Sequence, residues 1–250
     1  MWASYGDKPV LRGLTVNCEA QQITALVGPS GSGKSTILRV AMGLHATDKG
    51  FVVVDGEHCE DYTERRWREV RRKMGLVFQN SALFDSLTVL QNVGFFPFYV
   101  ERQPWRKVRN RAEEILRELG LQDSANKLPN QLSGGMQRRV ALARSLVYHP
   151  KILLYDEPTT GLDPLNIDIV SDMIVETAER FGVTSIVVSH DLQAITRVAD
   201  EVIIIGNGIG HSIGPPTALL QSQEPEVLEF TRAWRDQIAH YAEYVNHQPQ

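Results

Sequence analysis

The sequence predicts an α/β fold built on a mainly parallel sheet, with a helical subdomain inserted into it. The first observation is that short runs rich in apolar and β-branched residues recur ahead of turns or helical patterns, at 23–27, 51–54, 76–78, 152–155, 184–188 and 202–205. The second is that the interval between 78 and 152 holds no strand-like run of comparable strength. A chain of 250 residues is long enough to bury a large core together with such an insertion.

Composition narrows the classes of function. Lys and Arg number 26 and Asp and Glu 30, giving a formal net charge of −4, which argues against a protein that binds nucleic acid through bulk positive charge. Cys18 and Cys59 are too few for a disulfide framework and are expected to be reduced packing residues of an intracellular protein. The longest apolar stretches fall far short of the ~20 residues that cross a bilayer, and no secretory signal is visible. We therefore expect a chain that does not span the membrane.

The strand at 23–27 leads into a glycine-rich loop and a helical run at 35–44. The loop is Gly28-Pro29-Ser30-Gly31-Ser32-Gly33-Lys34-Ser35, which matches the pattern GxxxxGK[ST] of P-loop NTPases. Glycines let the backbone turn so that several N–H groups converge on phosphate oxygens, and the helix N-terminus adds a positive dipole end. We predict that this loop, with Thr36 after it, binds the phosphates of a nucleoside triphosphate, that Lys34 reaches the β- and γ-phosphates and that Ser35 ligates Mg²⁺. A Gly/Ser-rich turn with a solvated lysine is the alternative that the pattern alone leaves open.

The inserted segment contains two predicted helices. Pro104 and Gly120 bound the first, whose apolar residues share one face. Ser133, Gly134 and Gly135 precede the second, predicted from about 137 to 147, and its start is a second phosphate-binding helix terminus. Because one chain cannot easily place two such termini around a single triphosphate, we predict a homodimer with nucleotide between the subunits.

The strand at 152–155 ends on two carboxylates, Asp156 and Glu157. Asp156 is suited to the Mg²⁺ shell, directly or through water. Glu157 is suited to orienting or deprotonating the water that attacks the γ-phosphate. In isolation the pair could equally cap the strand before Pro158, but beside a loop that carries Lys34 this alternative becomes weak.

The last third of the chain carries turn and capping signals. Asp163 and Pro164 start a helix that stops at Gly182. The sequence Gly206-Asn207-Gly208 predicts a turn that joins two terminal strands, which supplies an antiparallel β portion.

In this order the motifs resemble those of the ATPases of ABC transporters, in which the serine-glycine-glycine segment faces nucleotide held by the other protomer. The resemblance covers nearly the whole chain and implies a P-loop NTPase (ABC ATPase) core at 1–80 and 149–215, with a β subdomain in its N-terminal part. It implies a helical signature subdomain at 81–148 and a C-terminal helical extension at 216–250. It also implies ATP and Mg²⁺ as cofactors and integral membrane permease subunits as partners, with no nucleic acid. The expected location is the cytoplasmic face of the inner or plasma membrane, or the stromal face in a plastid.

The resemblance also gives roles to residues that are weak signals by themselves. Gln79 matches the glutamine that senses Mg²⁺ and the attacking water, and His190 matches the switch histidine that contacts the γ-phosphate. With Glu157 these two form the expected catalytic set. Tyr5 lies where the family stacks an aromatic residue on adenine, although so few residues precede it that the first strand is expected to be short. The duller alternatives are a polar strand end for Gln79, a helix cap for His190 and core packing for Tyr5.

Within the family, the segment 78–89 and Met136 in the signature look most like the ATPases of MCE-associated lipid transporters, which include Mla-type phospholipid systems. This resemblance implies lipid transport and an MCE-type substrate-binding protein in the complex. Amino-acid importers share much of the same sequence and are the nearest alternative. A soluble ABC ATPase that acts on DNA or ribosomes is a further alternative, disfavoured because 79–133 holds no sustained heptads and the chain carries one cassette.

Three surface features support hypotheses. Phe84, Phe95, Phe96 and Phe98 form either a groove for a permease helix or part of the subdomain core. The basic run at 65–73 either faces anionic headgroups or is a solvated helix face, which we favour. An apolar stripe near the end of the chain is hypothesised to brace the second protomer, and it consists of Val227, Thr231, Trp234, Ile238, Tyr241 and Val245.

Gly161, Leu162 and Asp163 match the family's D-loop, which crosses the dimer interface.

Overall fold

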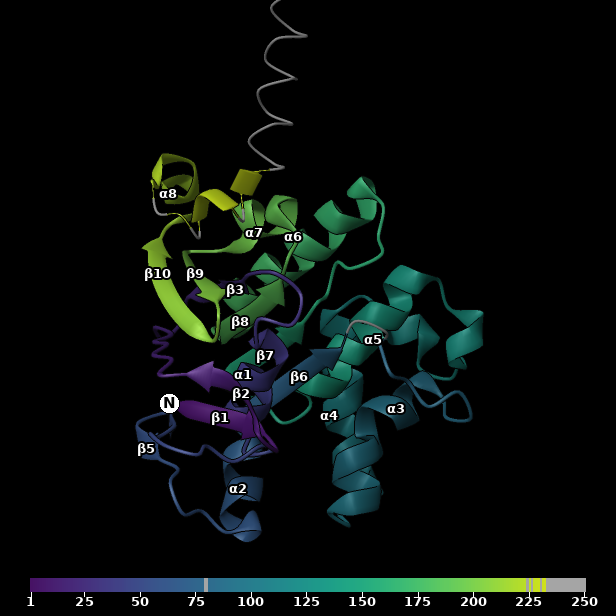
Figure 1. The fold of residues 1–250 in the computed structure, drawn as a ribbon. Coiled ribbons are helices and arrows are strands. Elements are labelled where there is room, and N and C mark those ends of the chain that lie inside the picture. The colour runs from purple at the N-terminus through teal and green to yellow at the C-terminus, as the bar shows by residue number, and fades with distance from the viewer. Residues whose placement is uncertain (79–80, 224, 226, 230, 233–250) are drawn as a thin grey trace, which may run out of the picture.

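The computed structural model describes residues 1–78, 81–223, 225, 227–229, 231 and 232. The centre of the described part is a six-stranded sheet in the order β10-β9-β3-β8-β7-β6 (Figure 1). Its strands are β3 (Ile23–Val27), β6 (Met74–Phe78), β7 (Ile152–Asp156), β8 (Thr184–Ser189), β9 (Glu201–Gly206) and β10 (Ile209–Gly214). All neighbours pair in parallel except β10, which runs antiparallel to β9. The predicted α/β fold with a mainly parallel sheet is therefore confirmed.

Helices cover both faces of the sheet. α1 (Lys34–Ala41) packs on the face that carries Leu154, whereas α6 (Pro164–Phe181) packs through Ile174 on the opposite face, which carries Leu153. Neighbouring residues of one strand point to opposite faces, so a sheet that is covered on both sides needs continuous apolar strands. This requirement explains why the runs recognised in the sequence are uninterrupted rather than alternating.

The capping signals of α6 are confirmed. Asp163 is the N-cap residue, and its side chain accepts a hydrogen bond from the backbone N–H of Asn166. Pro164 opens the helix and Gly182 ends it with φ 60. α7 (Leu192–Val198) follows β8 in the same manner, with Asp191 as its N-cap.

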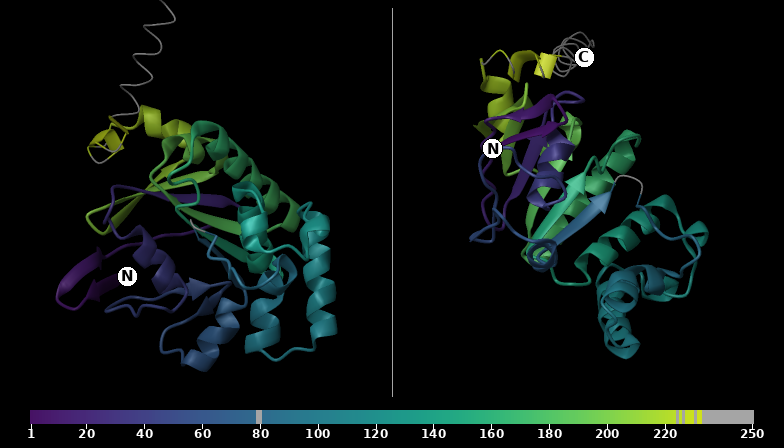
Figure 2. Two further views of the ribbon diagram at one scale, coloured as in Figure 1. Left: turned by 90° about the vertical axis from the view of Figure 1, so that its right-hand side faces the viewer. Right: turned by 60° about the horizontal axis from the view of Figure 1, so that its bottom comes forward.

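The inserted segment is helical throughout most of its length. It contains α3 (Val89–Phe95), the π-helical turn η1 (Phe96–Val100), α4 (Trp105–Glu118), the 3-10 turns η2 (Gln122–Ser124) and η3 (Pro129–Gln131), and α5 (Gly134–Leu146). These helices lie beside β6, at the edge of the sheet remote from β10 (Figures 1 and 2). The hydroxyl of Ser145 on α5 donates to the carbonyl oxygen of Leu76 on β6 at 2.8 Å. The subdomain boundaries at 81 and 148 stay a prediction.

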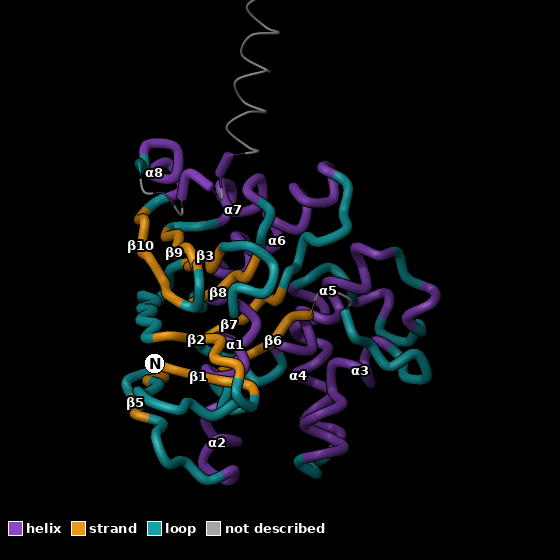
Figure 3. The backbone as a smooth tube through the Cα atoms, in the orientation of Figure 1, coloured by secondary structure: helices purple, strands orange, loops and turns teal. Residues whose placement is uncertain are grey.

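Two short antiparallel pairs complete the N-terminal part (Figure 3). β1 (Trp2–Tyr5) pairs with β2 (Lys8–Arg12), and β4 (Val53–Val54) pairs with β5 (Glu57–His58). The first strand is thus short, as expected. The run at 51–54 forms fewer strand residues than predicted, because β5 offers only two partners.

The turn after α1 has no room for a side chain. Gly43 has φ +64, and a Cβ at this position would overlap the indole of Trp67 in α2 (Glu64–Arg71). Replacing Gly43 by alanine is expected to lower the free energy of unfolding by about 1–3 kcal/mol through overpacking, beyond the cost of the left-handed backbone. Thermal unfolding measures this loss against Gly56→Ala, since Gly56 has φ +77 with nothing within 4 Å of its Cβ. Equal melting temperatures of the two variants would contradict the argument.

Carboxylates neutralise most of the basic run at 65–73. Ion pairs join Arg66 to Glu57 and Glu69, Arg68 and Arg71 to Glu64, Arg72 to Glu101, and Lys73 to Asp55 and Glu57. Charges that are paired along a surface leave little field for anionic headgroups. The arrangement favours the interpretation of the run as a solvated, ion-paired face.

One of these ion pairs links the core to the inserted helices. The side chain of Glu101, just after η1, is only 10% exposed and accepts hydrogen bonds from Arg72 Nε at 2.6 Å and from Gln103 Nε2 at 2.7 Å. Burial acts to raise the pKa of Glu101, but interactions with Tyr148, Arg72 and Gln103 outweigh it and hold this pKa below its ordinary value. The carboxylate therefore ties the end of α2 to the helical subdomain.

The chain continues after β10 into α8 (Pro216–Gln221). Val227 is fully buried beside Leu219 and Ile195, and the hydroxyl of Thr231 donates to its carbonyl oxygen at 2.7 Å. The rest of the apolar stripe, Trp234, Ile238, Tyr241 and Val245, lies outside the described residues, so the bracing hypothesis stays a prediction. None of the helices in the described ranges combines the length and apolarity needed to cross a membrane.

Candidate functional site

Three neighbouring strands bring the glycine-rich loop, the two carboxylates and His190 to one edge of the sheet. β3 leads into the glycine-rich loop, β7 ends on Asp156, and β8, which lies between them, leads to His190. The register pairs Val27 with Ser189, and Asp156 with Val188, so all three strands end at nearly the same level. The carboxyl edge of a parallel sheet is where such folds bind phosphate ligands.

The glycine-rich loop folds closely around Lys34. Gly28 has φ +151, and a Cβ there would overlap the carbonyl oxygen of Ile205 on β9, so only glycine fits. The ammonium of Lys34 donates to the carbonyl oxygens of Gly28 at 2.8 Å and Pro29 at 3.0 Å. Burial lowers the pKa of Lys34, and the negative charges of Glu157 and Asp156 oppose this effect.

The loop suits an anion with several oxygens. Ser32 Oγ is buried and has no hydrogen-bond partner within the described part of the chain. The first backbone N–H groups of α1, next to Ser35 and Thr36, have no partners inside the helix. An orphaned hydroxyl, free N–H groups and a lysine at one loop are a donor set that phosphate satisfies.

Ser35 and Asp156 come together at the start of α1 and the end of β7. Ser35 Oγ donates to Asp156 Oδ1 at 3.0 Å. A hydroxyl and a carboxylate are hard oxygen ligands of the kind that Mg²⁺ prefers, and this ion keeps several waters in its shell. The described residues hold no group of three His, Cys, Asp or Glu side chains suited to a metal.

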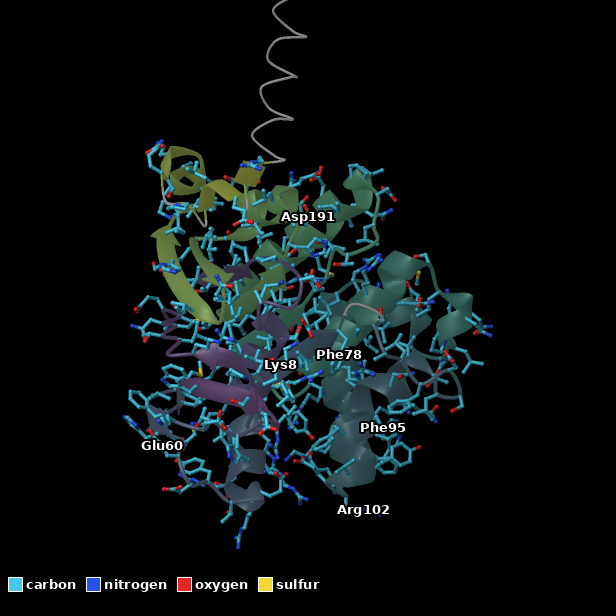
Figure 4. The ribbon with its side chains drawn as sticks, viewed as in Figure 1. Lys8, Glu60, Phe78, Phe95, Arg102 and Asp191 are labelled. Carbon is cyan, nitrogen blue, oxygen red and sulfur yellow. The ribbon has the colours of Figure 1, made fainter. Side chains whose placement is uncertain are left out.

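Glu157 directly follows β7 and is held by β8, by His190 after β8 and by Thr160 in its own turn. Its backbone has φ 54, which is uncommon outside glycine, and its N–H donates to the carbonyl oxygen of Val188 at 2.9 Å. Its Oε2 lies 2.8 Å from Nδ1 of His190 and accepts a hydrogen bond from the hydroxyl of Thr160 at 2.9 Å. The N-cap of α7 is Asp191, labelled in Figure 4, so the predicted alternative of His190 as the helix cap is wrong.

Tyr5 lies beside α1 rather than in the core. Its ring is 43% exposed and stacks on His45, with centroids 4.3 Å apart and an interplanar angle of 27°. Its hydroxyl accepts a hydrogen bond from Arg39 at 3.2 Å, and this bond is the main cause of a lowered Tyr5 pKa. The alternative of ordinary core packing is therefore wrong. The base-stacking role of Tyr5 stays a prediction.

The second phosphate-binding terminus belongs to the helical subdomain. Ser133 is the N-cap of α5 and accepts a hydrogen bond from the N–H of Met136 at 3.3 Å. α5 begins at Gly134, earlier than predicted, because the glycines after the cap join the helix. Within the described residues, no hydrogen bond or ion pair links Ser133, Gly134 or Gly135 to the glycine-rich loop. These residues are thus not part of the same chain's constellation in this structure.

Gln79 lies outside the described residues. Phe78, labelled in Figure 4, ends β6 and pairs in register with Asp156, and the role predicted for Gln79 stays a prediction. The sequence did not reveal three residues that contact the predicted site residues: Thr160, which contacts Glu157, and Arg39 and His45, which contact Tyr5. The only signal for Thr160 was its place three residues after Glu157, and nothing in the spacing marked the other two.

Comparison with known proteins agrees with this geometry. Residues 11–160 match the family described as ABC transporter. The chain is 39% identical to the general L-amino acid transport ATP-binding protein AapP of Rhizobium johnstonii, covering 94% of this chain and 90% of that protein. It is 35% identical to the intermembrane phospholipid transport system ATP-binding protein MlaF of Haemophilus influenzae, covering 92% and 88%.

Solved structures give the same answer for the fold. The chain is similar to cbiO1 from Clostridium perfringens, part of the ABC transporter complex cbiONQ, with a TM-score of 0.80, 29% identity and coverage of 97% and 98%. It is also similar to the ATP-binding cassette MJ0796, solved as a dimer in a post-hydrolysis state with ADP and Pi, with a TM-score of 0.72, 32% identity and coverage of 85% and 94%. Subunits of this kind form dimers and work with membrane permeases. The chain belongs to the ABC transporter family, as an ATPase that binds ATP with Mg²⁺ and hydrolyses it to power transport.

Proposed function

We propose that two copies of this chain hydrolyse ATP between them and thereby drive a lipid transporter. The observation that carries the proposal is the meeting of two contacts at one sheet edge: Ser35 with Asp156 at 3.0 Å, and Glu157 with His190 at 2.8 Å. Both lie beside Lys34, whose pKa responds to the two carboxylates. A general base and an oxygen-ligand pair next to a lysine in a glycine-rich loop suit phosphoryl transfer to water.

The phosphates would be held by residues 28–36. Lys34 would exchange its two carbonyl partners for the β- and γ-phosphate oxygens, which are charged and stronger acceptors. The N–H groups of the loop and of the first turn of α1 would bind the remaining oxygens. Ser35 and Asp156, with Gln79 as the third proposed ligand, would hold Mg²⁺, which supplies positive charge that offsets the phosphates.

Glu157 would take the proton of the attacking water. The Thr160 hydroxyl and His190 Nδ1 both lie within hydrogen-bonding distance of its Oε2, so the side chain is held in place for this role. Gln79 would orient the same water, and His190 would contact the γ-phosphate. Tyr5 would stack on the adenine through the part of its ring that is exposed.

The Ser133, Gly134 and Gly135 segment would act on the nucleotide bound by the other copy. Among the described residues, no hydrogen bond or ion pair ties this helix terminus to its own glycine-rich loop, and its N–H groups and dipole suit a phosphate of the second subunit's nucleotide. Two such termini would close over two nucleotides, and hydrolysis would reopen the dimer. Gly161, Leu162 and Asp163 would lie at the same interface.

Aromatic side chains on the helical subdomain offer the surface for a permease. Phe84 is 43%, Phe96 45% and Tyr99 40% exposed, and Phe84 packs on Phe95 with centroids 4.3 Å apart. Figure 4 labels Phe95 among the side chains of this subdomain. Asn92, which is fully buried, binds both backbone groups of Phe84, so the loop that presents this ring is held in place. An exposed and rigid aromatic patch suits a short apolar helix of a membrane partner at the cytoplasmic face.

The proposed cargo is phospholipid, with an MCE-type protein in the complex. Met136 in the signature and the segment 78–89 support this choice, together with the likeness to MlaF. Amino-acid import is the second candidate, favoured by the likeness to AapP and to the glutamine transport protein GlnQ of Geobacillus stearothermophilus at 36% identity.

Reconstitution tests the cargo directly. The subunit and the permease encoded beside it would be placed in proteoliposomes, with transfer of a fluorescent phospholipid and uptake of radiolabelled glutamine measured in parallel. We expect ATP-dependent phospholipid transfer that the Glu157→Gln complex lacks. ATP-dependent amino-acid uptake without lipid transfer would establish the alternative. A neighbouring gene for an MCE-domain protein, or for an amino-acid-binding protein, gives an independent answer.

A further inference from the structure

The carboxylate of Glu157 is anchored through one oxygen only. The hydroxyl of Thr160 donates to Oε2 at 2.9 Å, and Nδ1 of His190 lies 2.8 Å from the same atom. Within the described residues, no hydrogen bond engages Oε1. Hydrogen bonds to Oε2 restrict the orientation of the carboxylate. Oε1 is then the oxygen that can accept a hydrogen bond from water.

The two residues that contact Oε2, Thr160 and His190, differ in their surroundings. The side chain of His190 is 56% exposed, whereas Thr160 belongs to the turn that follows Glu157 itself. The backbone N–H of Thr160 lies 3.4 Å from the carbonyl oxygen of Glu157, and this turn runs into the capped start of α6. His190 is thus open to solvent, whereas Thr160 is part of the same turn as the carboxylate.

The backbone alone does not fix the carboxylate. The N–H of Glu157 donates to Val188 at 2.9 Å and its φ of 54 is set by the turn, but several side-chain torsions lie between this backbone and Oε1. A displacement of about 1 Å at a reacting group can cost about 100-fold in rate. The side chain therefore needs a restraint of its own.

We infer that Thr160 is a positioning residue for hydrolysis: its hydroxyl anchors Oε2 of Glu157 so that Oε1 faces the attacking water, including when His190 turns to the γ-phosphate. The inference rests on the proposed role of Glu157 as the base. It gives Thr160 no contact with the substrate.

The test compares Thr160→Val with Thr160→Ser in the complex with the permease. Valine keeps the shape and removes the donor, so kcat for ATP should fall about 10- to 100-fold while KM stays within about twofold. Serine keeps the donor and should retain most of kcat. A fold-supporting role would instead lower the melting temperature of Thr160→Val, which thermal unfolding of the same samples measures.

The outcomes separate this inference from the proposed function. Wild-type kcat in Thr160→Val beside an inactive Glu157→Gln would overturn the role of Thr160 and leave Glu157 as the base. Equal losses of kcat in the serine and valine variants would overturn it too, because the hydroxyl would not be the cause. An active Glu157→Gln would remove the proposed base itself.

Discussion

Replacing Lys34 by alanine is expected to weaken ATP binding by about 10- to 100-fold, because hydrogen bonds to charged groups contribute about 1.5–3 kcal/mol each. Lys34 is only 6% exposed, and its ammonium lies inside the loop, where it donates to two backbone carbonyl oxygens. The substitution also leaves the carbonyl oxygens of Gly28 and Pro29 without this donor. Titration calorimetry with a non-hydrolysable ATP analogue and Mg²⁺ measures the loss.

Lys107→Ala is the matched control for Lys34. Lys107 lies on the exposed side of α4, so its removal makes the same charge change away from the site. The Lys107→Ala variant should bind the ATP analogue with the same affinity as the unchanged protein. An unchanged affinity in Lys34→Ala would contradict the phosphate role, and a matching loss in Lys107→Ala would point to bulk charge instead.

Glu157→Gln is expected to keep ATP binding and to lower turnover by about 100- to 10,000-fold, the contribution typical of a general base. Glutamine has nearly the same shape, and its amide oxygen can still accept from Thr160, so the turn should keep its form. With hydrolysis blocked, ATP-bound subunits should accumulate as a closed dimer. Steady-state phosphate release measures the first effect, and sedimentation with ATP and Mg²⁺ measures the second.

Glu176→Gln provides the comparison for this variant. Glu176 lies on the exposed side of α6, so the same chemical change there should leave turnover and assembly as they are. Normal phosphate release in Glu157→Gln would be incompatible with the assigned base. A monomer in the presence of ATP would argue against nucleotide held between two copies.

The sequence was most informative where local chemistry and tertiary packing impose the same structure. β3 has the predicted bounds because it is buried on both faces, and α6 starts and stops at Asp163 and Gly182 because these residues satisfy its ends. Prediction was weaker where pairing partners decide the outcome. β4 is shorter than its apolar run because β5 offers only two pairing residues. α5 begins at Gly134 because Ser133 caps the helix there and the two glycines after it join the first turn.

In the candidate site, too, residues in one continuous motif were predictable, whereas contacts made by tertiary packing were not. A phosphate loop is continuous in sequence, so Lys34 and Ser35 were recognisable from spacing. The partners of Tyr5 were not, because His45 and Arg39 reach it only through the packing of β1 against α1. Gln79 and the end of the apolar stripe lie outside the described residues, and their roles stay predictions.

The glycine-rich loop, Asp156, Glu157 and His190 all follow three adjacent strands, and this placement has a consequence for protein engineering. The segment from 81 to 148 approaches the sheet from the β6 side and contributes none of those groups to its own chain. Grafting this segment from a relative, with its serine-glycine-glycine turn kept, would then redirect the ATPase to a different transporter while its reaction chemistry stays as it was.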